Sequence, residues 1–152
     1  MAFELVYTVN DYYDGPRSGI ANYCGRPHRY ECQFDEAVDD WTDTFVLTPV
    51  ASDTLALALE QWTIWRRWEA LFQSGKVLLD SHPGLGAQDE RYDELAEVLK
   101  RRLSENSAES VRAKGHFRVR PYQEDTPAGV MRELEVEWGS VTQAGAPASQ
   151  RR

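Results

Sequence analysis

The chain has 152 residues, 41% of them hydrophobic, and carries five Trp, seven Tyr and five Phe. This composition is typical of one globular domain and excludes an intrinsically disordered chain. The formal net charge is −8, which disfavours nucleic acid and anionic membranes as partners and favours basic protein surfaces.

The sequence also predicts the compartment. No run of 18 apolar residues is present, and the N-terminus lacks the basic and cleavable parts of a signal peptide. The two cysteines, Cys24 and Cys32, flank a predicted hairpin turn over residues 24–27, across which they would not face each other. We therefore expect free thiols in a reduced, cytoplasmic protein.

Alternating apolar and polar residues predict four strands in the first third of the chain. These strands cover residues 3–9, both arms of a hairpin over 20–35, and residues 44–49. In the second arm of the hairpin, we expect Tyr30, Cys32 and Phe34 to point into the core. A Gly/Pro/Asp loop over 11–19 and an acidic loop over 35–43 connect the strands.

Two helices are predicted in the middle of the chain. The first covers residues 53–73, with Ser52 or Asp53 as its N-cap, and large apolar side chains, three tryptophans among them, occupy most of its circumference. We expect this aromatic helix to be buried at the centre of the protein. The second covers residues 88–103, and its acidic first turns and basic last turn suit the helix dipole.

The last third of the chain predicts two strands, over residues 110–120 and 131–139. The first strand carries basic side chains at every second position: Arg112, Lys114, His116, Arg118 and Arg120. The second carries acidic side chains in the same way: Glu133, Glu135 and Glu137. We expect antiparallel pairing that places the opposite charges side by side on the solvated face. This charge ladder is favoured over nucleic-acid binding, which needs several unpaired cations, and over recognition of an acidic protein.

Together these elements predict a single α+β domain over residues 1–141, in the order β-β-β-β-α-α-β-β. A twisted antiparallel sheet of about six strands would pack around the buried helix 53–73, with the helix 88–103 alongside. The small and polar residues 142–152 predict a disordered tail.

The acidic loop is a candidate surface for a protein partner. It places Trp41 among Asp39, Asp40 and Asp43, and an aromatic side chain inside an acidic rim is typical of an interface anchor. The alternative is a solvated loop with Trp41 folded back onto the core. The leading expectation is a small, acidic, non-enzymatic interaction protein: a subunit, an adaptor, or an inhibitor or immunity-type protein that covers a basic or mixed-charge partner.

A second hypothesis is a small-ligand module with a pocket between the curved sheet and the aromatic helix. Its candidate binding residues are Tyr12, Tyr13, Asp14, Arg17, Arg66 and Glu69. Arg66 and Glu69 are three residues apart, so they can pair on the helix surface. Asp14-Gly15-Pro16 is also good turn chemistry, so the loop 11–19 is either functional or only a turn.

An enzyme of unrecognised type is the third hypothesis, with Asp11 or Asp14 as base and His28 or Arg17 nearby. The chain lacks the P-loop, dinucleotide-binding, nucleophile-elbow and H-E-x-x-H motifs, which favours a non-enzymatic role.

A metal site is also disfavoured. Cys24, His28 and Cys32 form a C-x3-H-x3-C pattern, but structural zinc sites usually combine two tight ligand pairs. We expect no cofactor and no metal, and the sequence leaves the partner's identity and the oligomeric state open.

Overall fold

The computed structural model describes residues 2–104, 109–121, 126 and 129–141. Its strands are β1 (Glu4–Tyr12), β2 (Pro16–Tyr23), β3 (Arg26–Asp35), β4 (Asp40–Pro49), β5 (Val111–Val119) and β6 (Leu134–Gly139). Its helices are α1 (Ser52–Gln73), the 3-10 turns η1 (Leu79–Ser81) and η2 (Pro83–Leu85), and α2 (Glu90–Leu103). The predicted α+β class and the order of strands and helices are confirmed, whereas the tail over 142–152 lies outside the described residues.

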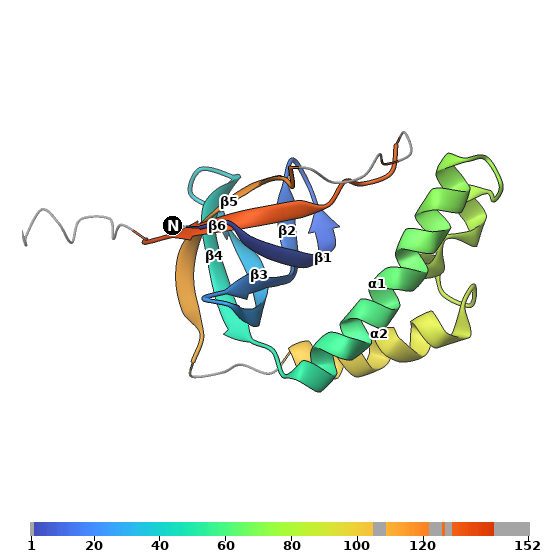
Figure 1. Ribbon diagram of the computed structural model, residues 1–152, viewed down its shortest axis with the longest axis horizontal. Coiled ribbons are helices and arrows are strands. Elements are labelled where there is room, and N and C mark those ends of the chain that lie inside the picture. Colours follow the sequence, from blue (N-terminus) through green and yellow to red (C-terminus); the bar gives the residue numbers. More distant parts are fainter. Residues whose placement is uncertain (1, 105–108, 122–125, 127–128, 142–152) are drawn as a thin grey trace, which may run out of the picture.

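The six strands form a closed barrel. Each strand pairs antiparallel with its neighbour in sequence, and β1 also pairs with β6. The two helices connect β4 to β5 and lie beside the barrel (Figure 1). The predicted arrangement, a twisted sheet packed around a buried helix 53–73, is therefore not confirmed: the sheet closes on itself and the helix lies outside it. A small closed barrel fills its interior with its own side chains, so it needs no helix at its centre.

Aromatic side chains dominate the barrel interior. The buried residues there are Ala21, Tyr30, Cys32, Phe45, Leu47, Ala113, Val136 and Trp138. The Tyr30 hydroxyl donates to the Thr8 carbonyl at 2.8 Å, and Trp138 Nε1 donates to the Asn22 carbonyl at 2.8 Å. Both buried polar groups are thus satisfied, as the interior of a barrel requires.

A second apolar core joins the helices to the outer face of β1 and β2. Ile20, Ala58, Leu95 and Leu99 are buried there, with Tyr7 and Ile64 among the half-buried side chains around them. The predicted apolar face of α2 is confirmed, because Leu95 and Leu99 are its buried residues. The Asp89 side chain caps α2 by accepting from the Tyr92 amide.

Helix α1 is far less buried than its sequence suggests. Thr54, Ala58 and Glu69 are its buried residues, and all three of its tryptophans are half-buried. The helix lies against the barrel and against α2, which leaves part of its wide apolar arc facing solvent. Its N-cap is Ala51, without a side-chain cap, rather than Ser52 or Asp53. Asp53 instead accepts from Arg102 of α2.

The basic stripe of β5 faces the acidic stripe of β6, as predicted. Arg118 lies opposite Glu135 and forms an ion pair with it, and His116 lies opposite Glu137. Arg120 also forms an ion pair with Glu133, whereas Lys114 lies opposite Gly139 and Arg112 donates to Gln33 of β3. The three facing pairs of charges favour the observed register.

The first two hairpins are tighter than expected. The predicted loop 11–19 shrinks to residues 13–15, because β1 continues to Tyr12 and β2 begins at Pro16. Cys24 and Gly25 form a two-residue turn in which both residues have positive φ, 52° and 76°, as a type I′ turn requires. Both cysteines are free thiols, and burial raises the pKa of the Cys32 thiol.

The predicted inward position of Phe34 is wrong, because the β3–β4 register shifts between Cys32 and Phe34 and leaves the Phe34 ring 43% exposed.

Within the described residues, no helix is long and apolar enough to cross a membrane.

Candidate functional site

Exposed apolar side chains gather at the tip of the β3–β4 hairpin and at the adjoining β1–β2 turn. Val38, in the turn after β3, is 68% exposed, and Tyr13, in the β1–β2 turn, is 70% exposed. The Phe34 ring meets the half-buried Trp41 ring edge-on at 5.1 Å. Trp41 itself packs against the barrel core, as the alternative interpretation of the loop expected. We call Tyr13, Phe34, Val38 and Trp41 the hairpin patch.

Arg17 holds the two parts of the hairpin patch together. Its Nε donates to the Tyr13 carbonyl at 2.7 Å and its Nη2 donates to the Asp14 carbonyl at 2.9 Å. The same guanidinium lies 5.2 Å from the centre of the Trp41 ring, and Nη1 contacts the Cys32 sulfur. Arg17 thus stabilises the turn between β1 and β2. These contacts favour the interpretation that residues 11–19 form only a turn, rather than a functional loop.

A rim of carboxylates surrounds the hairpin patch. Five acidic residues of the hairpin are exposed: Asp35, Glu36, Asp39, Asp40 and Asp43. Asp35 and Asp40 accept from backbone amides of the hairpin itself. In the part of the chain that the structure describes, none of the five forms an ion pair. The patch therefore combines exposed apolar surface with carboxylates that form no ion pair among the described residues.

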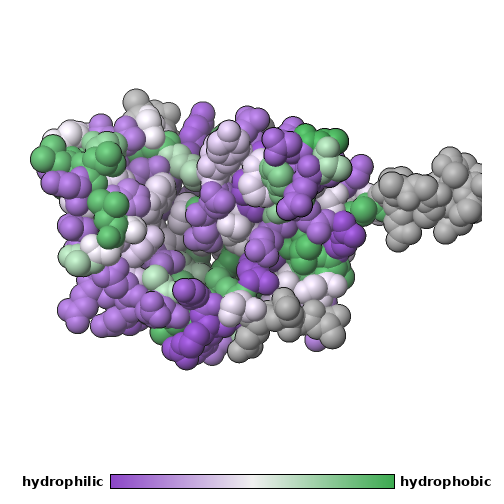
Figure 2. Space-filling model, turned by 180° about the vertical axis from the view of Figure 1, so that it is seen from behind, coloured by the Kyte–Doolittle hydropathy of each residue, from purple (hydrophilic) through white to green (hydrophobic). Residues whose placement is uncertain are grey.

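Two adjoining hollows separate the barrel from α1. Their volumes are about 220 and 260 Å³, and they share Val9, Trp62 and Met131; we call them together the barrel–helix groove. The surface is hollowed between the two parts of the molecule (Figure 2). The first hollow is also lined by Arg66, Arg120 and Arg132. The second is also lined by Asn10, Tyr12, Gln61, Trp65, His82 and Tyr92.

Arg66, which lines the groove, forms the predicted pair with Glu69. Arg66 Nη1 donates to Glu69 Oε1 at 2.6 Å, and Glu69 Oε2 accepts from the Met131 amide at 3.0 Å. Buried Glu69 thus ties the segment before β6 to α1. The Arg66 guanidinium also lies 5.7 Å from the centre of the Trp62 ring, which stacks on Trp65 at 5.3 Å.

Replacing Glu69 by alanine should lower the free energy of unfolding by about 2 kcal/mol, because it removes the partner of Arg66 and the acceptor of the Met131 amide. Urea denaturation measures the change. Glu69→Gln, which keeps an acceptor for the amide, should lose about half as much. Glu97 is an exposed glutamate of α2, and Glu97→Ala should stay within about 0.5 kcal/mol. Equal losses in the Glu69 and Glu97 alanine variants would contradict the role of Glu69.

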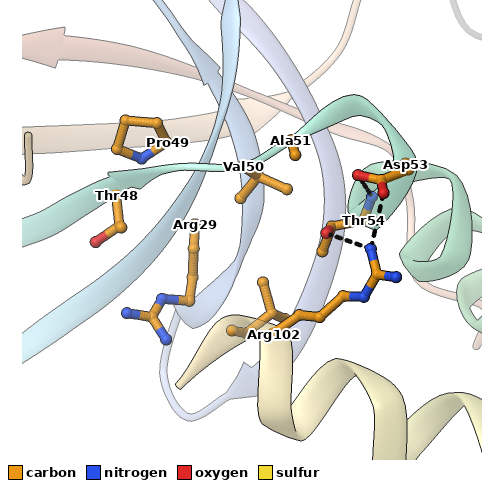
Figure 3. A pocket seen from close by; sticks show the side chains of 9 residues that line it. Arg29, Thr48, Pro49, Val50, Ala51, Asp53, Thr54 and Arg102 are labelled. Carbon is orange, nitrogen blue, oxygen red and sulfur yellow. Dashed lines mark hydrogen bonds and ion pairs between the residues drawn. The ribbon is translucent and has the colours of Figure 1, made fainter. Parts of the chain in front are cut away.

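A third hollow, of about 390 Å³, lies where β4 leads into α1. Arg102 Nη1 donates to Asp53 Oδ2 at 3.0 Å and to the Thr54 hydroxyl at 3.2 Å. The hydrogen bond from Arg102 lowers the pKa of the Asp53 carboxyl group. The Arg29 guanidinium points away from the Arg102–Asp53 pair (Figure 3). Asp53 already neutralises the charge of Arg102, and this ion pair joins α1 to α2. The hollow therefore does not present a cluster of arginines that could bind an anion.

No protein-family model, curated protein or solved structure matches the chain.

The candidate bases do not meet His28, whereas Arg17 lies beside Asp14 and donates to its backbone carbonyl. Asp14 lies in the turn before β2, whereas His28 pairs with Ala21 near the other end of that strand, and His28 Nδ1 contacts the Arg26 carbonyl at 2.8 Å. Asp11 is exposed and pairs with Ser18. The strand length therefore separates each proposed base from His28.

The zinc pattern is likewise not a site. Cys24 lies in the β2–β3 turn, Cys32 lies inside the barrel, and His28 is buried between them along β3. Among the described residues, no group of three His, Cys, Asp or Glu side chains could hold a metal ion.

The six candidate ligand-binding residues fall into two places. Tyr13 belongs to the hairpin patch, and Asp14 and Arg17 lie next to it in the same turn and strand. Tyr12 and Arg66 line the barrel–helix groove, and Glu69 pairs with Arg66. Sequence reasoning did not single out Met131 and Arg132 as groove residues. Only the closure of the barrel brings that segment against α1.

Proposed function

We propose that the protein is a small, non-enzymatic interaction protein whose hairpin patch docks onto a basic surface of a protein partner. The observation that carries this proposal is the exposed apolar group of Phe34 and Val38 inside a rim of five carboxylates without ion pairs among the described residues. Apolar side chains supply affinity when they are buried, and the rim charges steer a basic partner and exclude acidic ones.

The rigidity of the patch supports the same role. Trp41 is held by the Phe34 ring on one side and by the Arg17 guanidinium, so little side-chain freedom remains to be lost on binding. Aromatic anchors held in this way are typical of the residues that dominate the energy of an interface.

The charge distribution elsewhere supports a protein rather than a nucleic acid as the partner. Arg118 and Arg120 of the basic stripe form ion pairs with Glu135 and Glu133, so they are not available to phosphates. Both cysteines are free thiols, which supports the reducing, cytoplasmic setting that this proposal includes.

A double variant of the hairpin tests the proposal. Val38→Ser with Asp39→Lys should weaken binding to the partner captured from a lysate of the source organism by at least about tenfold, because it removes an apolar contact and reverses a rim charge. Biolayer interferometry with the purified partner measures the dissociation constant. Raising the salt concentration should slow association of the unaltered protein.

The matched control is Leu79→Ser with Asp80→Lys, an equally exposed apolar and acidic pair in the segment after α1. This control should bind the partner as the unaltered protein does. Failure to capture a partner, or equal loss of binding in both double variants, would overturn docking through the hairpin patch.

A further inference from the structure

We propose that the barrel–helix groove binds a small, flat aromatic molecule that carries an acidic group. This ligand site is separate from the hairpin patch and goes beyond the proposed docking function. The inference combines three observations: an aromatic lining, a concentration of arginines, and hydrogen-bonding groups at the far end of the groove.

The first observation is that tryptophans line an open hollow instead of filling a core. Trp62 belongs to both hollows of the groove, and Trp65, stacked on it at 5.3 Å, lines the second. Both rings are half-buried. Tyr12 and Tyr92 line the same second hollow. A flat aromatic ligand would cover π-surface that the fold leaves in contact with water.

The second observation is the charge of the first hollow. In a chain of net charge −8, three arginines and one glutamate, Glu133, line this one hollow. Arg66 is engaged by Glu69, and Arg120 forms an ion pair with Glu133. Arg132 is exposed and forms no hydrogen bond or ion pair with any residue that the structure describes. A guanidinium binds a carboxylate through two parallel hydrogen bonds, so Arg132 can take the acidic group of the ligand.

The third observation concerns the second hollow. His82 Nδ1 accepts from the Gly84 amide at 2.9 Å, so in the neutral ring the proton is on Nε2, which is left as a donor. Asn10 and Gln61 add amide groups to the same lining. Polar substituents on the aromatic ring would find partners there, while the acidic group faces the arginines of the first hollow.

The size of the groove limits the ligand. Each hollow alone is smaller than the roughly 300 Å³ at which typical ligand pockets begin, but the two adjoin through Val9, Trp62 and Met131. A molecule of two fused rings with one carboxylate would extend from one hollow into the other.

Naphthoate is the probe for the test, with naphthamide as its neutral counterpart and cyclohexanecarboxylate as its non-aromatic counterpart. Naphthoate should bind with a dissociation constant below about 1 mM, and each counterpart at least about fivefold more weakly, because each lacks one of the two recognition elements. Proton–nitrogen NMR of the tryptophan indoles should show shifts at Trp62 and Trp65, with Trp41 and Trp138 unchanged.

Variants then locate the binding. Arg132→Gln and Trp62→Leu should each weaken naphthoate binding by at least about fivefold. The matched control is Arg67→Gln, an exposed arginine of α1 that lies outside the groove lining, and it should bind as before. Absence of saturable binding, equal binding of naphthamide, or equal loss in Arg132→Gln and Arg67→Gln would overturn the proposal. None of these results depends on the hairpin patch, so the two proposals fail separately.

Discussion

Replacing Gly19 by alanine is expected to lower the free energy of unfolding by about 4 kcal/mol, since it combines overpacking with loss of a buried hydrogen bond. A Cβ at this position of β2 would overlap the Thr8 carbonyl oxygen and lie 2.6 Å from the Tyr30 hydroxyl. These are the two atoms that form the buried hydrogen bond across the barrel. The Thr8 oxygen is backbone, so relieving the overlap must displace β1 from β2.

Urea denaturation followed by tryptophan fluorescence measures this loss. Gly139→Ala in β6 is the matched control, because a Cβ there meets no atom within 4 Å, and it should change the stability by less than about 1 kcal/mol. Tyr30→Phe removes the hydroxyl from the crowded site, so Gly19→Ala should be less harmful in that background. Equal effects of the two glycine substitutions would contradict the close packing of β2 against Tyr30.

The periodicity of the sequence predicted the strands and helices but not the closure of the barrel. Alternation determines which side chains share a face of a strand, and the opposite charges of Arg118 and Glu135 were enough to predict that β5 pairs with β6. Closure depends on β1 meeting β6, which rests on the pairs Glu4 with Val136 and Leu5 with Glu135. No local pattern marks a contact between strands so far apart in sequence.

The same long-range contact decides the burial of α1. A helix with apolar side chains on most sides is usually central, which is why Trp62 and Trp65 were interpreted as core residues. The closed barrel already has a core in Tyr30, Phe45 and Trp138, so the helix packs on its outside and its tryptophans remain half-buried. The aromatic side chains are therefore divided between the barrel core and the half-buried surface of α1, which composition alone cannot show.

Contacts between candidate site residues were predictable where the residues are close in sequence. The three-residue spacing of Arg66 and Glu69 predicts their ion pair, which the structure has. Glu69 also binds the Met131 amide, and this contact, between residues 62 positions apart in the chain, assembles the groove.

Trp138→Ala is expected to lower the free energy of unfolding by about 4 kcal/mol, because it leaves a large cavity in a closed interior. The Trp138 side chain is 1% exposed and its ring lies 5.6 Å from Phe45 and 5.8 Å from Phe117. Trp65→Ala, at a half-buried position on α1, should cost only about half as much. Urea denaturation of both variants makes the comparison, and a larger loss for Trp65 would place the main core on α1 after all.

Gly115 offers an independent test of the same packing. A Cβ at Gly115 would lie 2.7 Å from the Trp138 ring and 2.9 Å from the Phe45 ring, so Gly115→Ala alone should destabilise the barrel by about 2 kcal/mol. In the Trp138→Ala background the crowding against Trp138 is gone and the Phe45 ring can shift into the new cavity, so the same substitution should cost much less. This difference, measured as a double-mutant cycle, should exceed about 1 kcal/mol. Additive effects would mean that Gly115 and Trp138 do not share the space inside the barrel.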